Sequence, residues 1–426
     1  MRRIARENAP CALIALAGCA VLAWLGLYGF AWNDYDNEAR AAFDALVHGH
    51  VEQFLRVAPA YGGSLVERAP FALIPGLWGG GELAVYRMVA LPCLLASALL
   101  GVWLVARMRG EGRPALHRAL ALAVCVANPI TLRALEVGHP EELLGACLCV
   151  AAVLLASEDR GLWAGAALGL AIANKEWALL AAAPVLLALP ARRRVPCLAM
   201  AIAFASAVLA PLALVGSGGF VSATRATATA PSAIFQPWQI WWFFGEHGAL
   251  VHGAFGAAKP GYRIAPGWTA TISHPLVVVA GLAPGVALWA RRRGGRAGLR
   301  SALLALALAM LLRCVLDTWD TEYYLLPFVF AVLAWELCAP GPARPPVLAL
   351  SSSALAWLSF QWLPAHVSPD LQAAVFLAWS LPLAAVLARR LLLPRRAARA
   401  GHDVRGEPPS AHEMTVSALS RPLRTS

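Results

Sequence analysis

Three acidic residues, Asp34, Asp36 and Glu38, stand close together near the start of the chain, directly after its first apolar run. Asp34 and Glu38 are four residues apart, so they share one face of a helix that begins near Trp32. A carboxylate at this place can act as a general base and take a proton from an acceptor hydroxyl. The same residue types also cap helix N-termini, because their side chains accept hydrogen bonds from free backbone N–H groups. Both roles, base and cap, stay open for these residues.

Two cations stand where they can contact a phosphate group. Lys175 lies in the polar triplet Asn174-Lys175-Glu176 between two apolar runs, and Arg313 stands near the end of another apolar run. A cation at the end of a membrane-spanning helix is suited to an anionic headgroup. The alternative role for each is a salt bridge to a neighbouring carboxylate.

Further candidates for substrate binding gather at the ends of two other apolar runs. His139-Pro140-Glu141-Glu142 opens one run, where acids are also ordinary partners of the helix dipole. The second group follows Arg313 and consists of acids and tyrosines, namely Asp317, Asp320, Tyr323 and Tyr324. Ionisable groups at the ends of long apolar runs are costly to bury unless they are paired or functional. We expect these groups to line one cavity.

The motifs of several other chemistries are absent from the sequence. His48 and His50 stand two residues apart, which points their rings to different sides of a helix, so we predict no zinc site. There is no glycine-rich phosphate loop, no GxSxG and no HExxH, which leaves ATP-driven and protease chemistry without support.

Composition places the elements that carry these residues in a membrane. Of the 426 residues, 59% are hydrophobic and only 14% are charged, and the mean hydropathy is +0.62. A soluble domain is about one quarter charged. The net charge of +11 comes from arginine clusters between apolar runs, the pattern of cytoplasmic loops, and no basic stripe interleaved with aromatics suggests nucleic acid. We therefore predict an all-α polytopic membrane protein.

The apolar runs and the arginine clusters together predict about twelve transmembrane helices in a single domain, 1–393, with both termini cytoplasmic. The spans are expected at 11–31, 84–106, 116–132, 141–157, 161–174, 177–190, 196–215, 273–290, 299–316, 324–339, 346–363 and 371–393. Two outer loops, 32–83 and 216–272, are long. The tail, 394–426, is basic and is expected to be a disordered cytoplasmic segment.

The outer loops contain segments suited to the membrane surface. In the first, Asp36 to Phe54 alternates apolar and charged residues as an amphipathic surface helix does. In the second, the aromatic run from Pro237 to Phe244 predicts an interfacial or re-entrant segment. Leu16 to Cys19 spells a bacterial lipobox, but the apolar run continues beyond it, which favours an uncleaved first span over lipidation of Cys19.

This layout resembles the GT-C class of membrane glycosyltransferases. The stretch Gly138-His139-Pro140-Glu141-Glu142-Leu143-Leu144, followed by Asn174-Lys175-Glu176-Trp177, is similar to the polyprenol-phosphate-mannose-dependent branch, glycosyltransferase family 87 (DUF2029-like). The segment from Leu312 to Phe328, with its Tyr-Tyr-x-x-Pro-Phe, resembles actinobacterial relatives. The resemblance covers most of the transmembrane part and rests on short motifs.

The resemblance implies transfer of a hexose, with mannose first, from a polyprenyl-phosphate donor to a cell-envelope lipid or glycan acceptor outside the bacterial cytoplasmic membrane. It implies an early acid of the first outer loop as base, which Asp34 matches best and Asp36 second. Asp34-Tyr35-Asp36 has the spacing of a metal motif, but metal-independent members exist, so a divalent metal stays open. The competing functions are a transporter or lipid flippase, which would show paired halves and mid-membrane charges, and a structural subunit.

Overall fold

The computed structural model of the chain describes residues 34–216, 235–247, 258–338 and 344–393, together with residues 11, 13–15, 17–19, 222, 251 and 252. The described residues up to Leu392 belong to one compact unit, Met1–Leu392. Most of the first predicted span, 11–31, and the tail, 394–426, lie outside the described residues. Cys19 is buried, and its thiol donates a hydrogen bond to the carbonyl oxygen of Leu94 at 3.4 Å.

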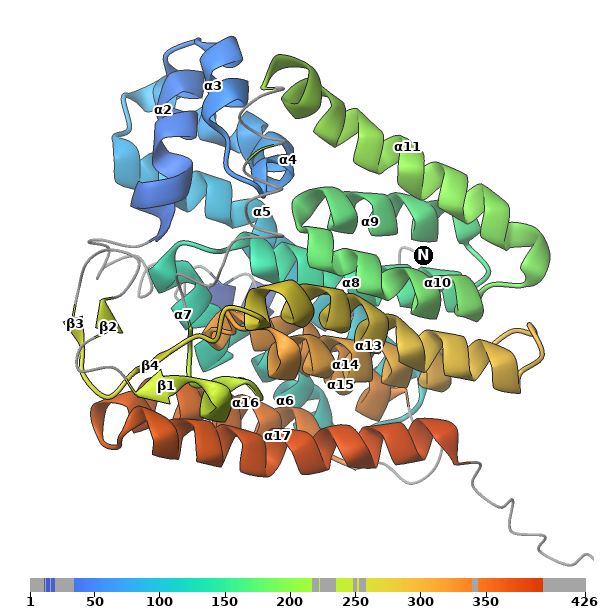
Figure 1. The fold of residues 1–426 in the computed structure, drawn as a ribbon. Helices are drawn as coiled ribbons and strands as arrows, with labels where there is room; N and C mark the ends of the chain where they lie inside the picture. The colour runs from blue at the N-terminus through green and yellow to red at the C-terminus, as the bar shows by residue number, and fades with distance from the viewer. Residues whose placement is uncertain are drawn as a thin grey trace, which may run out of the picture. The chain divides into compact units, whose positions relative to one another are not determined.

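The unit is a bundle of helices (Figure 1). In chain order its main helices are α5 (Glu82–Gly110), α6 (Ala115–Val126), α7 (Pro129–Val137), α8 (Glu141–Ser157), α9 (Gly161–Asn174), α10 (Ala182–Ala188), α11 (Ala191–Val215), α13 (Thr269–Arg291), α14 (Leu299–Leu316), α15 (Leu326–Leu337), α16 (Val347–Trp357) and α17 (Pro369–Leu392). A 3-10 segment, Glu176–Ala181, leads into α10, and another, Glu322–Leu325, leads into α15. After α16 the chain continues as a π-helical segment, Leu358–Trp362, and a 3-10 turn, Leu363–Ala365.

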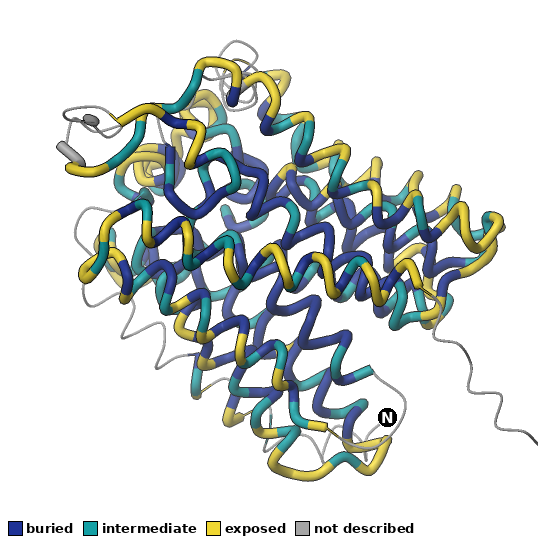
Figure 2. Tube along the Cα trace, turned by 60° about the horizontal axis from the view of Figure 1, so that its bottom comes forward, coloured by how far each residue is buried: buried dark blue, intermediate teal, exposed yellow. Residues whose placement is uncertain are grey.

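Six segments of the described residues are long and apolar enough to cross a membrane. They are Glu82–Gly110, Ala115–Val137, Ala191–Val215, Thr271–Arg291, Leu299–Leu316 and Pro369–Leu392. A polytopic helical membrane protein is thereby confirmed, while the full number of twelve spans stays a prediction. Helices α14 and α15 form the centre, since nearly all their residues are buried, whereas α11 is mostly exposed. Buried residues gather in the interior of the bundle, and exposed residues lie around it (Figure 2). Because the hydrocarbon of a bilayer is itself apolar, exposed leucines and valines on α11 fit a lipid-facing helix.

The chain reverses direction at Lys175, so the predicted fifth and sixth runs are two separate segments. The backbone of Lys175 is extended (φ −153°, ψ 133°) and ends α9. Arg296 donates hydrogen bonds to the carbonyl oxygens of Ser157, the last residue of α8, and Ala188, the last of α10. The first residue of α8, Glu141, lies 3.3 Å from Lys175. Helices α8 and α10 are therefore parallel, and α9, which packs between α8 and α11, runs in the opposite direction to both (Figure 1).

The arginine clusters gather at one end of the bundle, which we call the arginine end. Arg107 pairs with Glu158 after α8 (2.6 Å), and Arg291 donates to the carbonyl oxygen of Leu391 near the end of α17 (3.5 Å). Together with Arg296, these contacts bring the clusters around 107, 193 and 296 and the end of α17 to the same end. This is the arrangement that the span assignment requires. The opposite end, where α8 begins and α9 and α14 finish, we call the polar end.

Helix α9 lies unusually close to α11 because its contact face carries glycines. Gly165 and Gly169 stand one turn apart, and a Cβ atom at either would collide with a backbone carbonyl oxygen of α11, that of Cys197 or of Ala201. Small residues at four-residue spacing let two membrane helices approach to backbone contact. Because α9 ends at Lys175, this packing also sets the position of the lysine.

We expect Gly169→Ala to destabilise the protein by about 1–3 kcal/mol, since the added methyl group must push α9 and α11 apart. The thermal unfolding midpoint of protein in detergent measures the loss. Gly110→Ala, at the end of α5, is the matched control, because nothing lies within 4 Å of its added Cβ. Equal midpoints for the two variants would contradict this account of the α9–α11 contact.

The region predicted as the first outer loop, which we call the first outer region by its predicted place, folds as short helices packed on the beginning of α5. They are a π-helical turn (Tyr35–Ala39), α2 (Arg40–Val47), α3 (Val51–Val57), α4 (Gly62–Ala72) and a 3-10 segment (Ile74–Trp78). They share a small core that includes Tyr35, Phe43 and Tyr86. The single helix predicted over Asp36–Phe54 is wrong: the chain turns at His48–His50, where Gly49 adopts φ +81°, a conformation that glycine tolerates best.

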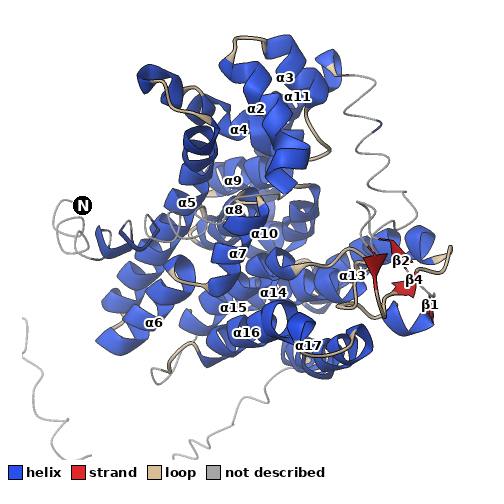
Figure 3. Ribbon diagram, turned by 90° about the vertical axis from the view of Figure 1, so that its left-hand side faces the viewer, coloured by secondary structure: helices blue, strands red, loops and turns tan. Residues whose placement is uncertain are grey.

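The second outer region includes two short antiparallel ladders, β1 (Glu246–His247) with β4 (Arg263–Ile264) and β2 (Val251–His252) with β3 (Ala258–Lys259) (Figure 3). The aromatic run before them packs on the bundle. Trp238 donates to the carbonyl oxygen of Ser359 at 3.0 Å, and Trp241 donates to that of Leu316 at 2.7 Å. The run therefore closes the ends of α14 and α16. Its indoles use free helix-end carbonyls as acceptors.

Candidate active site

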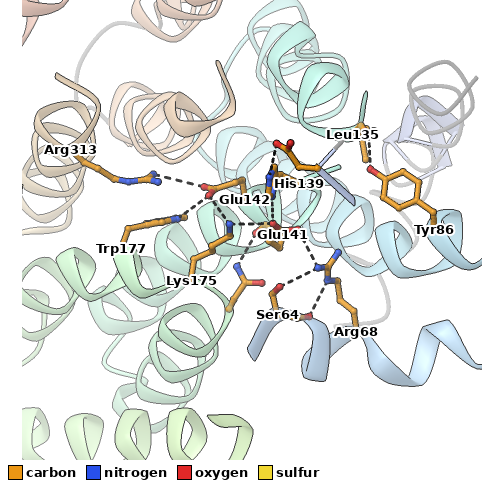
Figure 4. A network of polar contacts seen from close by, with 12 residues as sticks. Ser64, Arg68, Tyr86, Leu135, His139, Glu141, Glu142, Lys175, Trp177 and Arg313 are labelled. Atoms are coloured by element: carbon orange, nitrogen blue, oxygen red, sulfur yellow. Dashed lines mark hydrogen bonds and ion pairs between the residues drawn. The ribbon is translucent and has the colours of Figure 1, made fainter. Parts of the chain in front are cut away.

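Seven charged side chains meet at the polar end of the bundle and form what we call the polar cluster (Figure 4). They come from the first outer region, α4, the α7–α8 turn, the start of α8, the end of α9 and the end of α14. They are Asp34, Arg68, His139, Glu141, Glu142, Lys175 and Arg313. Apart from Asp34, each is at most 8% exposed. Buried charges are stable only when they are paired, so their mutual contacts decide what the site can do.

His139 sits in a tight turn between α7 and α8. Asn128 caps the start of α7 by accepting a hydrogen bond from the backbone N–H of Ile130, and Gly138 ends that helix with φ +106°. A side chain at position 138 would also collide with the backbone of Tyr35, so the glycine lets the first outer region approach the turn. The turn thereby places His139 directly beside the residues that precede α2.

Carboxylates flank both nitrogens of the His139 ring. Nδ1 lies 2.6 Å from Oε1 of Glu141, and Nε2 lies 3.1 Å from Oδ2 of Asp34. Burial disfavours the charged imidazolium, but the Glu141 charge and the hydrogen bond with Asp34 outweigh burial and Lys175, and they raise the pKa of His139 to about 9. The ring is also enclosed by Tyr323, with ring centroids 4.6 Å apart, and by Tyr61, at 5.5 Å.

Glu141 is fully buried and is the common partner of three cations. Besides His139, its carboxylate lies 3.2 Å from Arg68 and 3.3 Å from Lys175. Arg68 is fixed on α4 by hydrogen bonds to the carbonyl oxygen and the hydroxyl of Ser64. The backbone carbonyl of Glu141 accepts a hydrogen bond from Asn174 at 2.8 Å. Glu141 therefore joins α4, α8 and the end of α9.

Glu142 links Lys175 to Arg313. Its carboxylate lies 3.6 Å from Lys175 and 3.9 Å from Arg313, and it accepts a hydrogen bond from the Trp177 indole at 3.3 Å. The ammonium group of Lys175 also lies 4.0 Å from the centre of the Tyr61 ring. Burial alone would lower the pKa of Lys175, but Glu141 and Glu142 reverse this and raise it above its usual value. Lys175 is thus a fully compensated cation.

Arg313 is less well compensated. Its guanidinium lies between the rings of Tyr324 (4.0 Å to the centroid) and Trp177 (4.8 Å), and its Nη1 has no hydrogen-bond partner among the described residues. Cation–π contacts stabilise a buried guanidinium without using its N–H groups. The structure therefore holds a buried cation with a nitrogen, Nη1, that makes no hydrogen bond to the described residues.

The three acids of the first outer loop separate in the structure. Asp34 stands at the N-cap position of the first helical turn but makes no side-chain capping bond, and it contacts His139 instead. Asp36 pairs with Arg40 at 3.6 Å, away from the polar cluster. Glu38 is exposed, and after burial it is the main cause of the raised pKa of Tyr61. Of the three acids, Asp34 is therefore the one that belongs to the polar cluster.

The acids after α14 lie beside the polar cluster. Asp317 accepts a hydrogen bond from the backbone N–H of Trp319 and lies 3.7 Å from His274. Asp320 is fully buried, and neither of its carboxyl oxygens has a hydrogen-bond partner among the described residues. Burial, and then the Asp317 charge, raise the pKa of Asp320 well above its usual range. Within the described residues, no group of three or more His, Cys, Asp and Glu side chains is placed to hold a metal ion.

The sequence model of glycosyltransferase family 87 matches residues 63–314, more than half of the chain. The chain belongs to this family. It is therefore a membrane glycosyltransferase, and the resemblance found in the sequence is confirmed. No curated protein matches the chain.

The family 87 match contains the buried members of the polar cluster and leaves out the residues on either side. Inside it lie Arg68, His139, Glu141, Glu142, Lys175 and Arg313. Outside it lie Asp34, Asp36 and Glu38 at one end and Asp317, Asp320, Tyr323 and Tyr324 at the other. The structure nevertheless brings Asp34 and Tyr323 against His139, so segments outside the match complete the site.

Arg68 is the residue of this glycosyltransferase site that the sequence analysis missed. It stands in the stretch Leu65-Val66-Glu67-Arg68-Ala69, directly after another charged residue, in a loop that has several other charges. A cation at a position where the helix face is apolar is a weak signal of a buried ion pair. The partner, Glu141, is 73 positions further along the chain, which no local pattern reveals.

Proposed function

We propose that the chain transfers a hexose, with mannose as the first candidate, from a polyprenyl-phosphate donor to a lipid or glycan acceptor of the cell envelope. The observation that carries the proposal is the contact between a partly exposed carboxylate, Asp34, and a buried cluster that contains cations. Arg68, Lys175 and Arg313 are held there by buried carboxylates, Glu141 and Glu142. A carboxylate next to buried cations suits a reaction that removes a proton from an acceptor and binds the phosphate of a donor.

In the proposed reaction, Asp34 takes the proton of the acceptor hydroxyl. The acceptor oxygen forms a bond to C1 of the sugar, and the bond between C1 and the phosphate oxygen breaks. Polyprenyl phosphate leaves with the electron pair, and its new charge is stabilised by the cations of the polar cluster. The polyprenyl chain stays in the bilayer throughout.

Arg313 has better support than Lys175 as the contact for the donor phosphate. Lys175 already has two carboxylates within 3.6 Å, whereas the nearest carboxylate to Arg313 among the described residues, that of Glu142, lies 3.9 Å from Nη1, which makes no hydrogen bond. A planar guanidinium also offers paired donors to a phosphate. Lys175 would then act chiefly by holding Glu141 and Glu142 in place.

We expect Arg313→Gln to raise the donor KM about 10- to 100-fold, the equivalent of one lost charge-assisted hydrogen bond. Initial rates at varied donor concentration measure it. Lys175→Met serves as the comparison, and Arg56→Gln, at an exposed position, serves as the control. A donor KM that rises with Lys175→Met and not with Arg313→Gln would assign the phosphate to the lysine.

We further propose that the arginine end faces the cytoplasm and the polar end faces outward, in a bacterial cytoplasmic membrane. The support is the gathering of the arginine clusters at one end, since Lys and Arg resist translocation. Both termini would then be cytoplasmic. The test is to introduce a cysteine at position 38 or at position 110 and to add a thiol reagent from outside sealed cells. We expect the reagent to label the cysteine at position 38 and not the one at position 110.

A transfer assay tests the proposed function. Purified protein in lipid receives radiolabelled mannose on polyprenyl phosphate, on polyprenyl diphosphate or on a nucleotide, together with an envelope lipid extract. Label passing to the extract from the monophosphate donor alone is the expected outcome. Addition of EDTA measures whether a divalent metal is needed. Without transfer from any donor, a flux assay in sealed vesicles would test the transporter alternative, which the family assignment does not favour.

A further inference from the structure

We infer that His139 is a positioning residue. Its ring is permanently protonated on both nitrogens and, as an imidazolium, holds the Asp34 carboxylate in place. Glu141 and Arg68 keep the ring in this charged form. The inference rests on the proposed role of Asp34 as base. It assigns four residues to one chain of contacts, Arg68 to Glu141 to His139 to Asp34, of which Figure 4 labels the first three.

The proposed base Asp34 must be ionised to take a proton, and with ionised carboxylates on both sides the geometry of the ring requires two protons. An ionised carboxylate has only acceptors, so a nitrogen within hydrogen-bond distance of it must carry a hydrogen. Both nitrogens of His139 face carboxylate oxygens, at 2.6 and 3.1 Å. A neutral ring would leave one nitrogen lone pair against a carboxylate oxygen. Only the imidazolium satisfies both contacts at once.

Glu141 and Arg68 explain why the ring keeps its charge. Glu141 is fully buried, and Arg68 and Lys175 lie within 3.3 Å of its carboxylate. Two fixed cations hold Glu141 in its ionised form, and the ionised carboxylate then favours the imidazolium. Arg68 is itself held by Ser64 on α4. The helices of the bundle, and not the substrate, thus set the charge of His139.

In this arrangement the two carboxylate oxygens of Asp34 have different roles. Oδ2 is occupied by His139, so the proton of the acceptor hydroxyl goes to Oδ1. Because the ring already carries both protons, it cannot accept a third, and His139 is not a proton relay. The contribution of His139 is to fix the plane of the Asp34 carboxylate, which otherwise rotates about the Cβ–Cγ bond.

A pH dependence follows, and the surroundings of His139 determine its direction. The ring faces Asp34 from the first outer region, Glu141 from α8, Lys175 from the end of α9, and the hydroxyl-bearing rings of Tyr61 and Tyr323. The two carboxylates favour the proton and the lysine opposes it. Below pH 9 the imidazolium is present, and as the pH rises through about 9 one of its two contacts is lost. We expect kcat to fall there.

Kinetics of His139→Gln give the first test. Glutamine can donate one hydrogen bond to Asp34 but has no charge and does not reach both carboxylates. We expect kcat to fall about 100-fold because the base is misoriented, the donor KM to change less than about 2-fold, and the fall of kcat above pH 9 to disappear. His48→Gln, at an exposed position, is the control. An unchanged kcat, or an unchanged alkaline limb, would overturn the inference.

Nitrogen NMR of protein labelled in its ten histidines tests the charge state without any activity. The expected result is one ring that is doubly protonated at pH 8, that loses this signal in His139→Gln and shifts in Asp34→Asn. Arg68→Met should lower the pH at which that ring titrates by about one unit or more, and Arg68→Lys should restore it. A singly protonated ring at pH 8 refutes the inference even if transfer occurs. Absence of transfer with a doubly protonated ring refutes only the proposed function.

Discussion

Asp34→Asn is expected to lower transfer about 10³-fold while the protein folds normally. General base catalysis contributes roughly 10²- to 10⁴-fold, and asparagine removes the basic oxygen while it keeps the size of the side chain. The structure favours Asp34 over Asp36 as the base, because Asp34 contacts His139 whereas Asp36 pairs with Arg40. The effect should appear in kcat and in kcat/KM equally, since the lost interaction belongs to the transition state.

The measurement for Asp34→Asn is the initial rate of label transfer at saturating donor, at equal amounts of folded protein. Asp44→Asn is the matched control, because Asp44 is exposed and forms only a 3.7 Å surface pair with Arg40. Asp36→Asn compares the two candidate bases directly. Full activity in Asp34→Asn, with activity lost in Asp36→Asn, would move the base to Asp36 and remove the functional meaning of the His139 contact.

The parts of this site that sequence predicts are those governed by the cost of charge near a membrane. Glu141, Lys175 and Arg313 stand at the ends of apolar runs, where an ionisable residue needs a partner or a function. That argument selects the residues but not their partners. For Lys175 the sequence allows either a phosphate contact or a salt bridge, and the structure shows two carboxylates beside it.

The contacts themselves depend on how distant segments pack, which no local pattern contains. Asp34 and His139 are 105 residues apart, and they meet because Gly138 lets the backbone of Tyr35 approach the α7–α8 turn. Arg68 escaped notice for the same reason. The turn at Gly49 is a case in which a local pattern misleads. The amphipathic pattern continues without a break across Gly49, but the backbone turns there and forms two helices instead of one.

Glu141→Gln is expected to destabilise the protein by about 3–5 kcal/mol, the usual cost of leaving buried charges without their partner. Arg68, His139 and Lys175 all lie within 3.3 Å of its carboxylate, and the amide cannot neutralise any of them. Unfolding by SDS titration in lipid micelles measures the loss.

Glu158→Gln is the control for this loss. It breaks an ion pair that is as short as any of Glu141, 2.6 Å to Arg107, at the arginine end where both side chains are about one third exposed, and such pairs contribute about 1 kcal/mol or less. Adding Arg68→Met to Glu141→Gln should recover part of the stability, because it removes one of the stranded charges. If Glu141→Gln and Glu158→Gln lose the same small amount, water reaches the polar cluster freely. The cations there would then be solvated, and their attraction for a phosphate would be screened by water.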